Sequence, residues 1–212
     1  MSRARVGVFG GTFDPIHIGH LAAVEDAANL LTLERVLFVP NSVPPHKLDR
    51  TISSTDDRVA MIELSIADNP LFELSLIELE RDGPSYTLDT LRDLASQRLD
   101  SDLLFLAGYD ALRDLHTWHQ PDLLLAEFTL VFMDRPSGSS LPWPDLEARF
   151  PGIRNRIEIL SVPQLEISSE DIRRRVAEAR PIRYYVAPEV ERYIRAHKLY
   201  GSDTVSKEGL HE

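Results

Sequence analysis

The chain has 212 residues, of which 43% are hydrophobic, and it contains no cysteine. This length fits one domain with a sizeable core, and the lack of cysteine excludes disulfides, thiolate catalysis and cysteine-bound zinc. Its 23 Lys and Arg against 34 Asp and Glu give a formal charge of −11, which opposes binding to nucleic acid. No apolar run has the length of a signal peptide or a membrane span, so we expect a cytoplasmic protein that does not enter a membrane.

The hydrophobic pattern predicts strands that alternate with helices. Short apolar runs predict strands at residues 6–9, 35–40, 103–107, 128–133 and 156–162, and an alternating run predicts a half-exposed strand at 72–79. Helical spacing predicts helices at residues 21–33, 58–67, 169–179 and 188–197, and one after Ser85, its expected N-cap. Proline, serine and glycine predict loops at residues 44–47 and 135–144.

This alternation favours parallel strands, so we expect an α/β fold with a Rossmann-like, doubly wound parallel sheet. We expect a single domain over residues 1–201, with a small C-terminal helical annex at 165–201 and a disordered tail at 202–212. Ligands of such sheets bind outside the carboxyl ends of the strands, so the chemistry is expected just after Phe9, Pro40, Ala107 and Val162.

The strongest motif, GGTFDPIHIGHL at residues 10–21, directly follows the first strand. Gly10 and Gly11 let a backbone approach a bulky anion closely. His17 and His20 share a side if this turn is helical, and the positive end of the next helix points to the same place. The motif therefore predicts a phosphate site with two imidazole donors.

Other interpretations of the two histidines carry less weight. A lone histidine is most often an ordinary surface or helix-start residue, but this glycine pattern after a first strand favours function. A His-x-x-His metal pair lacks an obvious third ligand nearby. The chain has neither GxGxxG nor GxxxxGK[ST], which disfavours a dinucleotide oxidoreductase and a P-loop. Gly19, between the histidines, predicts room for a flat or bulky group.

The motif resembles the signature of the HxGH nucleotidyltransferase superfamily, which includes cytidylyltransferases, phosphopantetheine adenylyltransferase and the nicotinate or nicotinamide mononucleotide adenylyltransferases. Further stretches resemble the bacterial nicotinate-mononucleotide adenylyltransferases: NSVPPHK at residues 41–47, SYT at 85–87, TWH at 117–119, ISS at 167–169, and the end from YVAP at 185–188 to LY at 199–200. The resemblance covers about residues 5–201, nearly the whole chain.

The resemblance implies three sets of site residues. The catalytic set is His17, His20 and Arg173. These three would also bind ATP, together with Gly10, Gly11, Thr12, Phe13, Gly108, Asp110, Ser168 and Ser169. The mononucleotide would be bound by Asn41, His46, Lys47, Thr87, Trp118 and His119. Within this last set Trp118 would stack on the pyridine ring, and Thr87 and the backbone N–H of His119 would bind the nicotinate carboxylate.

Purely structural roles stay open for several of these residues. Lys47 could be a solvated surface lysine, and Trp118 a core or surface aromatic. Ser85, Asp110, and either Ser168 or Ser169 could be helix caps. The chain departs from the family pattern at two positions. Glu170 replaces the usual Ser or Thr and must point away from a triphosphate or meet Mg²⁺, and His119 replaces the more usual tyrosine.

The implied reaction transfers AMP from ATP to nicotinate mononucleotide, giving nicotinate adenine dinucleotide and pyrophosphate in NAD biosynthesis. Arg173 and the two imidazoles, partly charged with the help of bound phosphate, would hold the phosphates. Mg²⁺ would bridge phosphate oxygens through substrate and water, without a protein metal site. Preference for nicotinamide mononucleotide, transfer to phosphopantetheine and a non-catalytic nucleotide sensor are the alternatives. The oligomeric state stays open.

Overall fold

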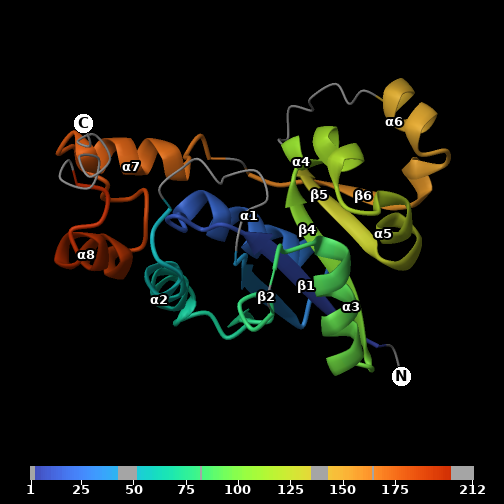
Figure 1. The fold of residues 1–212 in the computed structure, drawn as a ribbon, viewed down its shortest axis with the longest axis horizontal. Helices are drawn as coiled ribbons and strands as arrows, with labels where there is room; N and C mark the ends of the chain where they lie inside the picture. Colours follow the sequence, from blue (N-terminus) through green and yellow to red (C-terminus); the bar gives the residue numbers. More distant parts are fainter. Residues whose placement is uncertain (1–2, 43–51, 82, 135–142, 164, 202–212) are drawn as a thin grey trace, which may run out of the picture.

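The structure is a computed structural model that describes residues 3–42, 52–81, 83–134, 143–163 and 165–201. Within these residues, six parallel strands form one sheet in the order β3-β2-β1-β4-β5-β6 (Figure 1). They are β1 (Ala4–Gly11), β2 (Arg35–Pro40), β3 (Phe72–Leu74), β4 (Ser101–Gly108), β5 (Thr129–Asp134) and β6 (Ile157–Ser161). The strand order changes direction between β1 and β4, where doubly wound sheets bind ligands. The expected Rossmann-like parallel sheet is confirmed.

Helices cover both faces of this sheet. One hydrophobic cluster joins it to α1 (Ile18–Leu30), α2 (Thr55–Ile66), α7 (Ser169–Ala177) and α8 (Pro188–Ala196), with Ile172 and Val190 buried at its C-terminal side. The second cluster joins the other face to α3 (Thr87–Gln97), α4 (Asp110–Asp114), α5 (Pro121–Glu127) and α6 (Trp143–Arg149). Short 3₁₀ turns, η1 (Leu115–Thr117) and η2 (Ile153–Asn155), follow α4 and α6. The C-terminal helices thus share a core with the start of the chain.

The predicted strands are confirmed with small shifts at their ends, except for the one at residues 72–79. That strand ends at Leu74: the N–H of Ser75 makes the last hydrogen bond to the neighbouring strand, to the carbonyl of Phe38 at 2.9 Å, and the chain then turns. The turn is closed by the N–H of Leu79, which donates to the carbonyl of Leu76 at 2.8 Å. The prediction beyond residue 74 is therefore wrong.

The start of α3 also differs from the prediction. The N-cap of α3 is Tyr86, and no side chain caps it. Ser85 Oγ instead accepts a hydrogen bond from the N–H of Ser42 at 3.3 Å, so the prediction of Ser85 as N-cap is wrong. Helix α6 begins at Trp143, inside the predicted loop at 135–144, of which residues 135–142 lie outside the described part.

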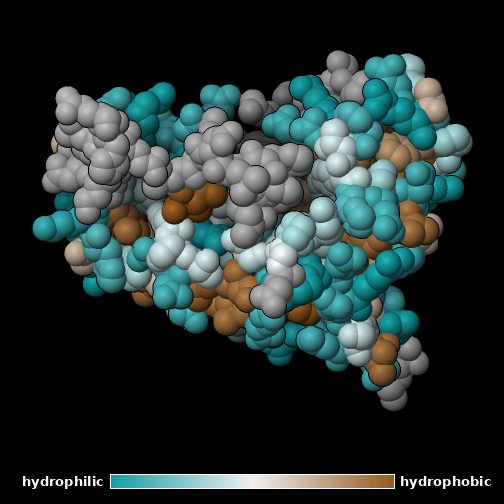
Figure 2. All heavy atoms as spheres, viewed as in Figure 1, coloured by the Kyte–Doolittle hydropathy of each residue, from teal (hydrophilic) through white to brown (hydrophobic). Residues whose placement is uncertain are grey.

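Hydrophilic residues dominate the face shown in Figure 2, and hydrophobic residues lie there in separate patches. Large exposed hydrophobic side chains are spread over many elements, as with Leu30 at the end of α1, Leu99 after α3 and Tyr184 before α8. Across the described residues, no helix combines the length and the apolar character that crossing a membrane requires. The predicted tail at 202–212 lies outside the described residues.

Candidate active site

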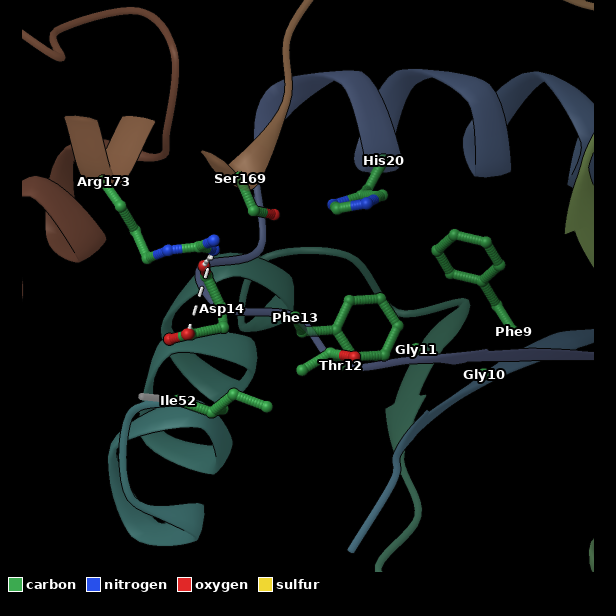
Figure 3. Close-up of a pocket in the computed structure, with 10 residues that line it drawn as sticks. All are labelled: Phe9, Gly10, Gly11, Thr12, Phe13, Asp14, His20, Ile52, Ser169 and Arg173. Carbon is green, nitrogen blue, oxygen red and sulfur yellow. Dashed lines mark hydrogen bonds and ion pairs between the residues drawn. The ribbon is translucent and has the colours of Figure 1, made fainter. Parts of the chain in front are cut away.

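A first pocket lies at the carboxyl end of β1, where the sequence motif predicts it. Its lining comes from β1, the following loop, α1, the segment before α2, and α7. The lining residues are Phe9, Gly10, Gly11, Thr12, Phe13, Asp14, His20, Ile52, Ser169 and Arg173. Figure 3 shows His20, Ser169 and Arg173 on one side of the pocket, facing the backbone of residues 10–13 on the other. Seven of the predicted ATP-binding residues are thereby brought together.

The two histidines of the motif hold each other and start α1. The N–H of His20 donates to Nδ1 of His17, and the N–H of His17 donates to Nδ1 of His20, both at 3.3 Å. Their rings stack with centroids 3.6 Å apart and an angle of 20° between the planes. Because each Nδ1 accepts a hydrogen bond, the proton of each neutral imidazole resides on Nε2. Both rings are therefore hydrogen-bond donors through Nε2.

Gly19 is required by this pairing. A Cβ at Gly19 would lie 3.1 Å from Nδ1 and 3.2 Å from Cε1 of His17, closer than a normal contact. The missing side chain thus makes room for the ring of His17, which can then stack on His20. The sequence predicts room for a flat group here, and the structure places the chain's own imidazole in it.

Burial lowers the pKa of both imidazoles in the unliganded protein, and the partial charge expected beside bound phosphate stays a prediction. Loss of water around His17 lowers its pKa from 6.5 to about 4. Burial, and then the neighbouring His17, lowers the pKa of His20 well below 6.5. Aromatic rings cause much of this loss of water, since Phe13 meets His20 edge-on at 5.6 Å and Phe9 does so at 5.9 Å. The pair therefore acts by hydrogen bonding in the unliganded protein.

Helix α7 brings its first turn to the same pocket. Ser169 Oγ donates to the carbonyl of Pro15 at 2.8 Å, and Arg173 Nη1 donates to the carbonyl of Asp14 at 2.5 Å. Ser168 is the N-cap, because its Oγ accepts the N–H of Asp171 at 3.1 Å, and it does not line the pocket. Glu170 is exposed and is also not among the lining residues. The family departure at Glu170 therefore leaves the pocket surface unchanged.

A second pocket lies beside the first and shares residues 9–11 with it. The rest of its lining comes from the ends of β2 and β4, the segment before α3, the start of α3, α4 and the residue after η1: Asn41, Glu78, Ser85, Thr87, Phe105, Ala107, Gly108, Ala111 and Trp118. Trp118 meets Phe105 edge-on at 5.7 Å and 88°, which fixes the indole at the wall. Three predicted mononucleotide residues, Asn41, Thr87 and Trp118, are thus brought together.

The second pocket offers polar groups that have few partners inside the protein. Asn41 Oδ1 is buried and has no hydrogen-bond partner within the described residues. The N–H groups at the start of α3, beginning at Thr87, have no side-chain cap. Glu78 is buried and accepts a hydrogen bond from Thr90 Oγ1 at 2.6 Å through one carboxylate oxygen. Such groups can bind a ligand that carries both an anion and hydroxyls.

The remaining predicted residues fall into three groups. Gly108, predicted to contact ATP, lines the second pocket, whereas Asp110 starts α4 and lines neither pocket. His119 stacks on Tyr86 at 4.2 Å, just beyond Trp118, and is not itself a lining residue. His46 and Lys47 lie outside the described residues. Sequence reasoning missed as lining residues Phe9, Asp14, Ile52, Glu78, Ser85, Phe105, Ala107 and Ala111.

No group of three or more His, Asp or Glu side chains suited to a metal ion occurs within the part of the chain that the structure describes. Asp14, the carboxylate of the first pocket, already accepts a hydrogen bond from Tyr200 at 2.6 Å. The donors in the pocket, His20 and Arg173, suit phosphate oxygens rather than a cation.

The fold and the first pocket define a class of nucleotidyltransferase, and a family model described as cytidylyltransferase-like matches residues 8–175. Two solved structures share the fold, both of Plasmodium falciparum nicotinic acid mononucleotide adenylyltransferase. The one complexed with APC is 20% identical and the one complexed with NaAD is 21% identical. Each has a TM-score of 0.74 and covers 93% of this chain and 97% of the other.

Curated relatives are much more similar in sequence. A probable nicotinate-nucleotide adenylyltransferase of Thermomicrobium roseum is 45% identical over 93% of this chain and 92% of its own. Proteins of the same name from Roseiflexus sp. and Thermus thermophilus are each 44% identical, over 94% and 92% of this chain and 100% and 99% of their own. The chain therefore belongs to the nicotinate-nucleotide adenylyltransferase family.

Proposed function

We propose that this protein transfers AMP from ATP to nicotinate mononucleotide, with nicotinate adenine dinucleotide and pyrophosphate as products. The observation that carries the proposal is the pair of adjoining pockets, which share the side-chain-free Gly10 and Gly11 and have His20 in the first and Trp118 in the second. Two anionic substrates can then meet over bare backbone, between imidazole donors and an aromatic ring. The family membership supports the same reaction.

ATP occupies the first pocket in this proposal. The backbone of residues 10–13 and the N-terminus of α7 face its phosphates, with Ser169 at the start of that helix. His20 donates through Nε2 to the α-phosphate, and His17 holds His20 in that tautomer. Arg173 binds the β- and γ-phosphates. The predicted contacts of Asp110 and Ser168 are limited to the rim, because neither residue lines the pocket.

Nicotinate mononucleotide occupies the second pocket. Trp118 stacks on the pyridine ring, and Thr87 with the uncapped N–H groups of α3 binds the nicotinate carboxylate, since the positive end of a helix favours an anion. Asn41 serves the sugar or phosphate, because its amide can present oxygen or nitrogen. The backbone N–H of His119 is proposed as a further donor. His46 and Lys47 would reach the phosphate of the mononucleotide.

The reaction is an in-line displacement. An oxygen of the mononucleotide 5′-phosphate forms a bond to the α-phosphorus of ATP, and the bond to the bridging oxygen of pyrophosphate breaks. The nucleophile is an anion at neutral pH, so alignment and charge stabilisation supply the rate rather than a base. Mg²⁺, when carried by the ATP phosphates, supplies further charge neutralisation there. Neutral imidazoles suit this role, because each keeps an Nε2–H donor at physiological pH.

The test is a pyrophosphate-release assay with ATP and either nicotinate or nicotinamide mononucleotide, run side by side with the full chain. We expect pyrophosphate release only when ATP and a mononucleotide are both present. The kcat/KM should be higher for nicotinate than for nicotinamide mononucleotide, because N–H donors favour a carboxylate over an amide. A higher kcat/KM for the nicotinamide form would reverse the acceptor assignment. ATP binding without pyrophosphate release would favour a nucleotide sensor. Both substrates belong to cellular metabolism, so we place the reaction in the cytoplasm.

A further inference from the structure

The segment after α8 contacts Asp14, a residue of the first pocket, through one hydroxyl. Tyr200 OH donates to Asp14 Oδ1 at 2.6 Å, across 186 positions of sequence. Asp14 is 3% exposed, so this hydrogen bond is shielded from water. Burial, together with the charge of Asp14, raises the pKa of Tyr200 far above its ordinary value. The phenol therefore stays protonated and remains a donor at every pH of interest.

The residue that Tyr200 holds also holds Arg173. Arg173 Nη1 donates to the backbone carbonyl of Asp14 at 2.5 Å and lies 3.9 Å from its Oδ2 (dashed lines in Figure 3). The second distance is too long for a hydrogen bond, so the guanidinium and the carboxylate do not form a close, two-point ion pair. Arg173 thereby keeps N–H groups that can bind another anion.

A second guanidinium balances the charge of Asp14 from below. Arg58 is 2% exposed, and its Nη1 donates to the carbonyl of Thr12 at 2.9 Å. Burial lowers the pKa of Arg58, and the charge of Asp14 opposes that effect. The N–H of Ser53 also donates to Asp14 Oδ2, at 3.4 Å. Asp14 is thus an anion between two arginines, and Tyr200 occupies one of its two oxygens.

We propose that Tyr200 is a positioning residue for the phosphate site: by holding Asp14 Oδ1, it keeps the carboxylate from turning fully onto Arg173. The inference rests on the proposed adenylyl transfer, in which Arg173 binds the β- and γ-phosphates. Without the hydroxyl, the carboxylate keeps only the longer hydrogen bond from the N–H of Ser53, at 3.4 Å, and can rotate to compete with ATP for the guanidinium. The C-terminal segment therefore sets the affinity for ATP without contacting ATP.

The decisive variant is Tyr200→Phe in the full chain, which removes the hydroxyl and keeps the ring. We expect the Kd and the KM for ATP to rise about tenfold, since a hydrogen bond to a charged group is typically of that strength. The KM for nicotinate mononucleotide should stay within about twofold. The matched control is Tyr193→Phe, because Tyr193 OH donates to Asp57 Oδ1 at 3.0 Å from the same C-terminal region, and Tyr193 lines neither pocket.

Three outcomes would overturn the inference. They are an unchanged KM for ATP in Tyr200→Phe, an equal rise in both tyrosine variants, and an equal rise in KM for both substrates. If Tyr200→Phe is unstable, a double-mutant cycle that combines it with Asp14→Asn tests the coupling between the two residues. The KM for ATP is then measured at a temperature where all variants are folded. In the Asp14→Asn background the hydroxyl should make less than about a twofold difference, and fully additive effects would contradict the coupling through Asp14.

Failure of the proposed function is a separate result. If the parent protein makes no dinucleotide, the reaction assignment fails, yet the Kd for Mg·ATP measured by calorimetry still compares Tyr200→Phe with its parent. A tenfold weaker Kd would then support the positioning role alone. An unchanged Kd would remove that role whatever the parent catalyses.

Discussion

The two pockets are neighbours but are built differently. The first pocket is held by hydrogen bonds between segments distant in sequence, including those from Ser169 to Pro15 and from Arg173 to Asp14. Its histidine donor, His20, exchanges backbone hydrogen bonds with His17 and keeps one tautomer. The second pocket is walled by rings and by an uncapped helix start, and Asn41 Oδ1 has no partner there among the described residues.

This difference separates two tasks. Fixed donors suit a transition state, because they lose no freedom as charge moves onto the phosphates. Ring contacts and spare N–H groups suit recognition of a ground-state ligand, which they bind equally before and during the reaction. Changes in the first pocket should therefore affect kcat, and changes in the second pocket should affect the KM for the mononucleotide.

The largest effect is expected from His20→Ala. Loss of a preorganised donor should lower kcat by roughly two to four powers of ten, as removal of an oxyanion-hole donor does. The measurement is steady-state pyrophosphate release at saturating substrates, with His197→Ala, an exposed histidine outside both pockets, as control. Near-normal turnover of His20→Ala would remove this imidazole from the mechanism and erase the contrast between the pockets.

Trp118→Ala should act on recognition instead. We expect the KM for nicotinate mononucleotide to rise about tenfold to a hundredfold, because stacking on an aromatic ring contributes about 1–3 kcal/mol per base. The KM for ATP should change much less. Trp143→Ala is the matched control, since Trp143 lies in α6 beneath the guanidinium of Arg154 at 4.3 Å, away from both pockets. Equal increases in both KM values would undo the assignment of the pyridine ring.

Gly19→Ala separates catalysis from stability within one residue. Alanine in a helix should raise the free energy of unfolding by up to about 1 kcal/mol relative to glycine. The added Cβ, however, would lie 3.1 Å from Nδ1 of His17 and must displace that ring. Displacing the ring also weakens the His17 cap of α1, which offsets the gain from alanine. We therefore expect kcat to fall about tenfold while thermal stability changes little. A variant with parental kcat would show that the stacked arrangement of the imidazoles is not needed.

The smallest effect concerns pH. Unfolded histidine gains a proton near pH 6.5, whereas His17 stays neutral down to about pH 4, so the unfolded state binds more protons between these values. The free energy of unfolding must then fall as pH decreases through this window, by at most about 1.4 kcal/mol per pH unit for each such histidine.

His17→Asn should reduce this slope, since asparagine keeps an acceptor suited to a helix N-cap and does not titrate. Urea unfolding of parent and variant between pH 7 and pH 4.5 measures the difference. The parent should lose about 1–3 kcal/mol more than the variant over that range. Parallel curves would mean that His17 is not buried in a neutral form, and would weaken the account of the first pocket.

Much of the fold is readable from the sequence because buried parallel strands are nearly continuous apolar runs. That pattern marks β1, β2 and β4 between glycine or proline residues that stop each run. It fails for β3, which ends where the chain turns between Leu76 and Leu79 although the alternation of apolar and polar residues continues. The helices α5 and α6 were not predicted either, because each has only seven residues and is too short for a helical period to show.

The candidate site divides in the same way. Residues inside a local motif, such as Gly11 and His20, were predicted because glycine freedom and histidine spacing are properties of adjacent residues. Asp14 lies in that motif too, but its partner Tyr200 is 186 positions away, so its position in the network needs the fold. Glu78 belongs to no motif. It lines the second pocket only because the fold brings the segment between β3 and α3 to that place. The individual contacts with substrates stay predictions.

The wall common to the two pockets contains Gly10 and Gly11, which have no side chains to divide them. One compound bearing a purine, a short polyphosphate-like linker and a pyridine could therefore lie across both spaces at once. Such a bisubstrate inhibitor gives up its translational freedom a single time, and its second half meets its pocket at a high effective concentration. Its potency would come from the linkage of the two halves rather than from a higher affinity for either half.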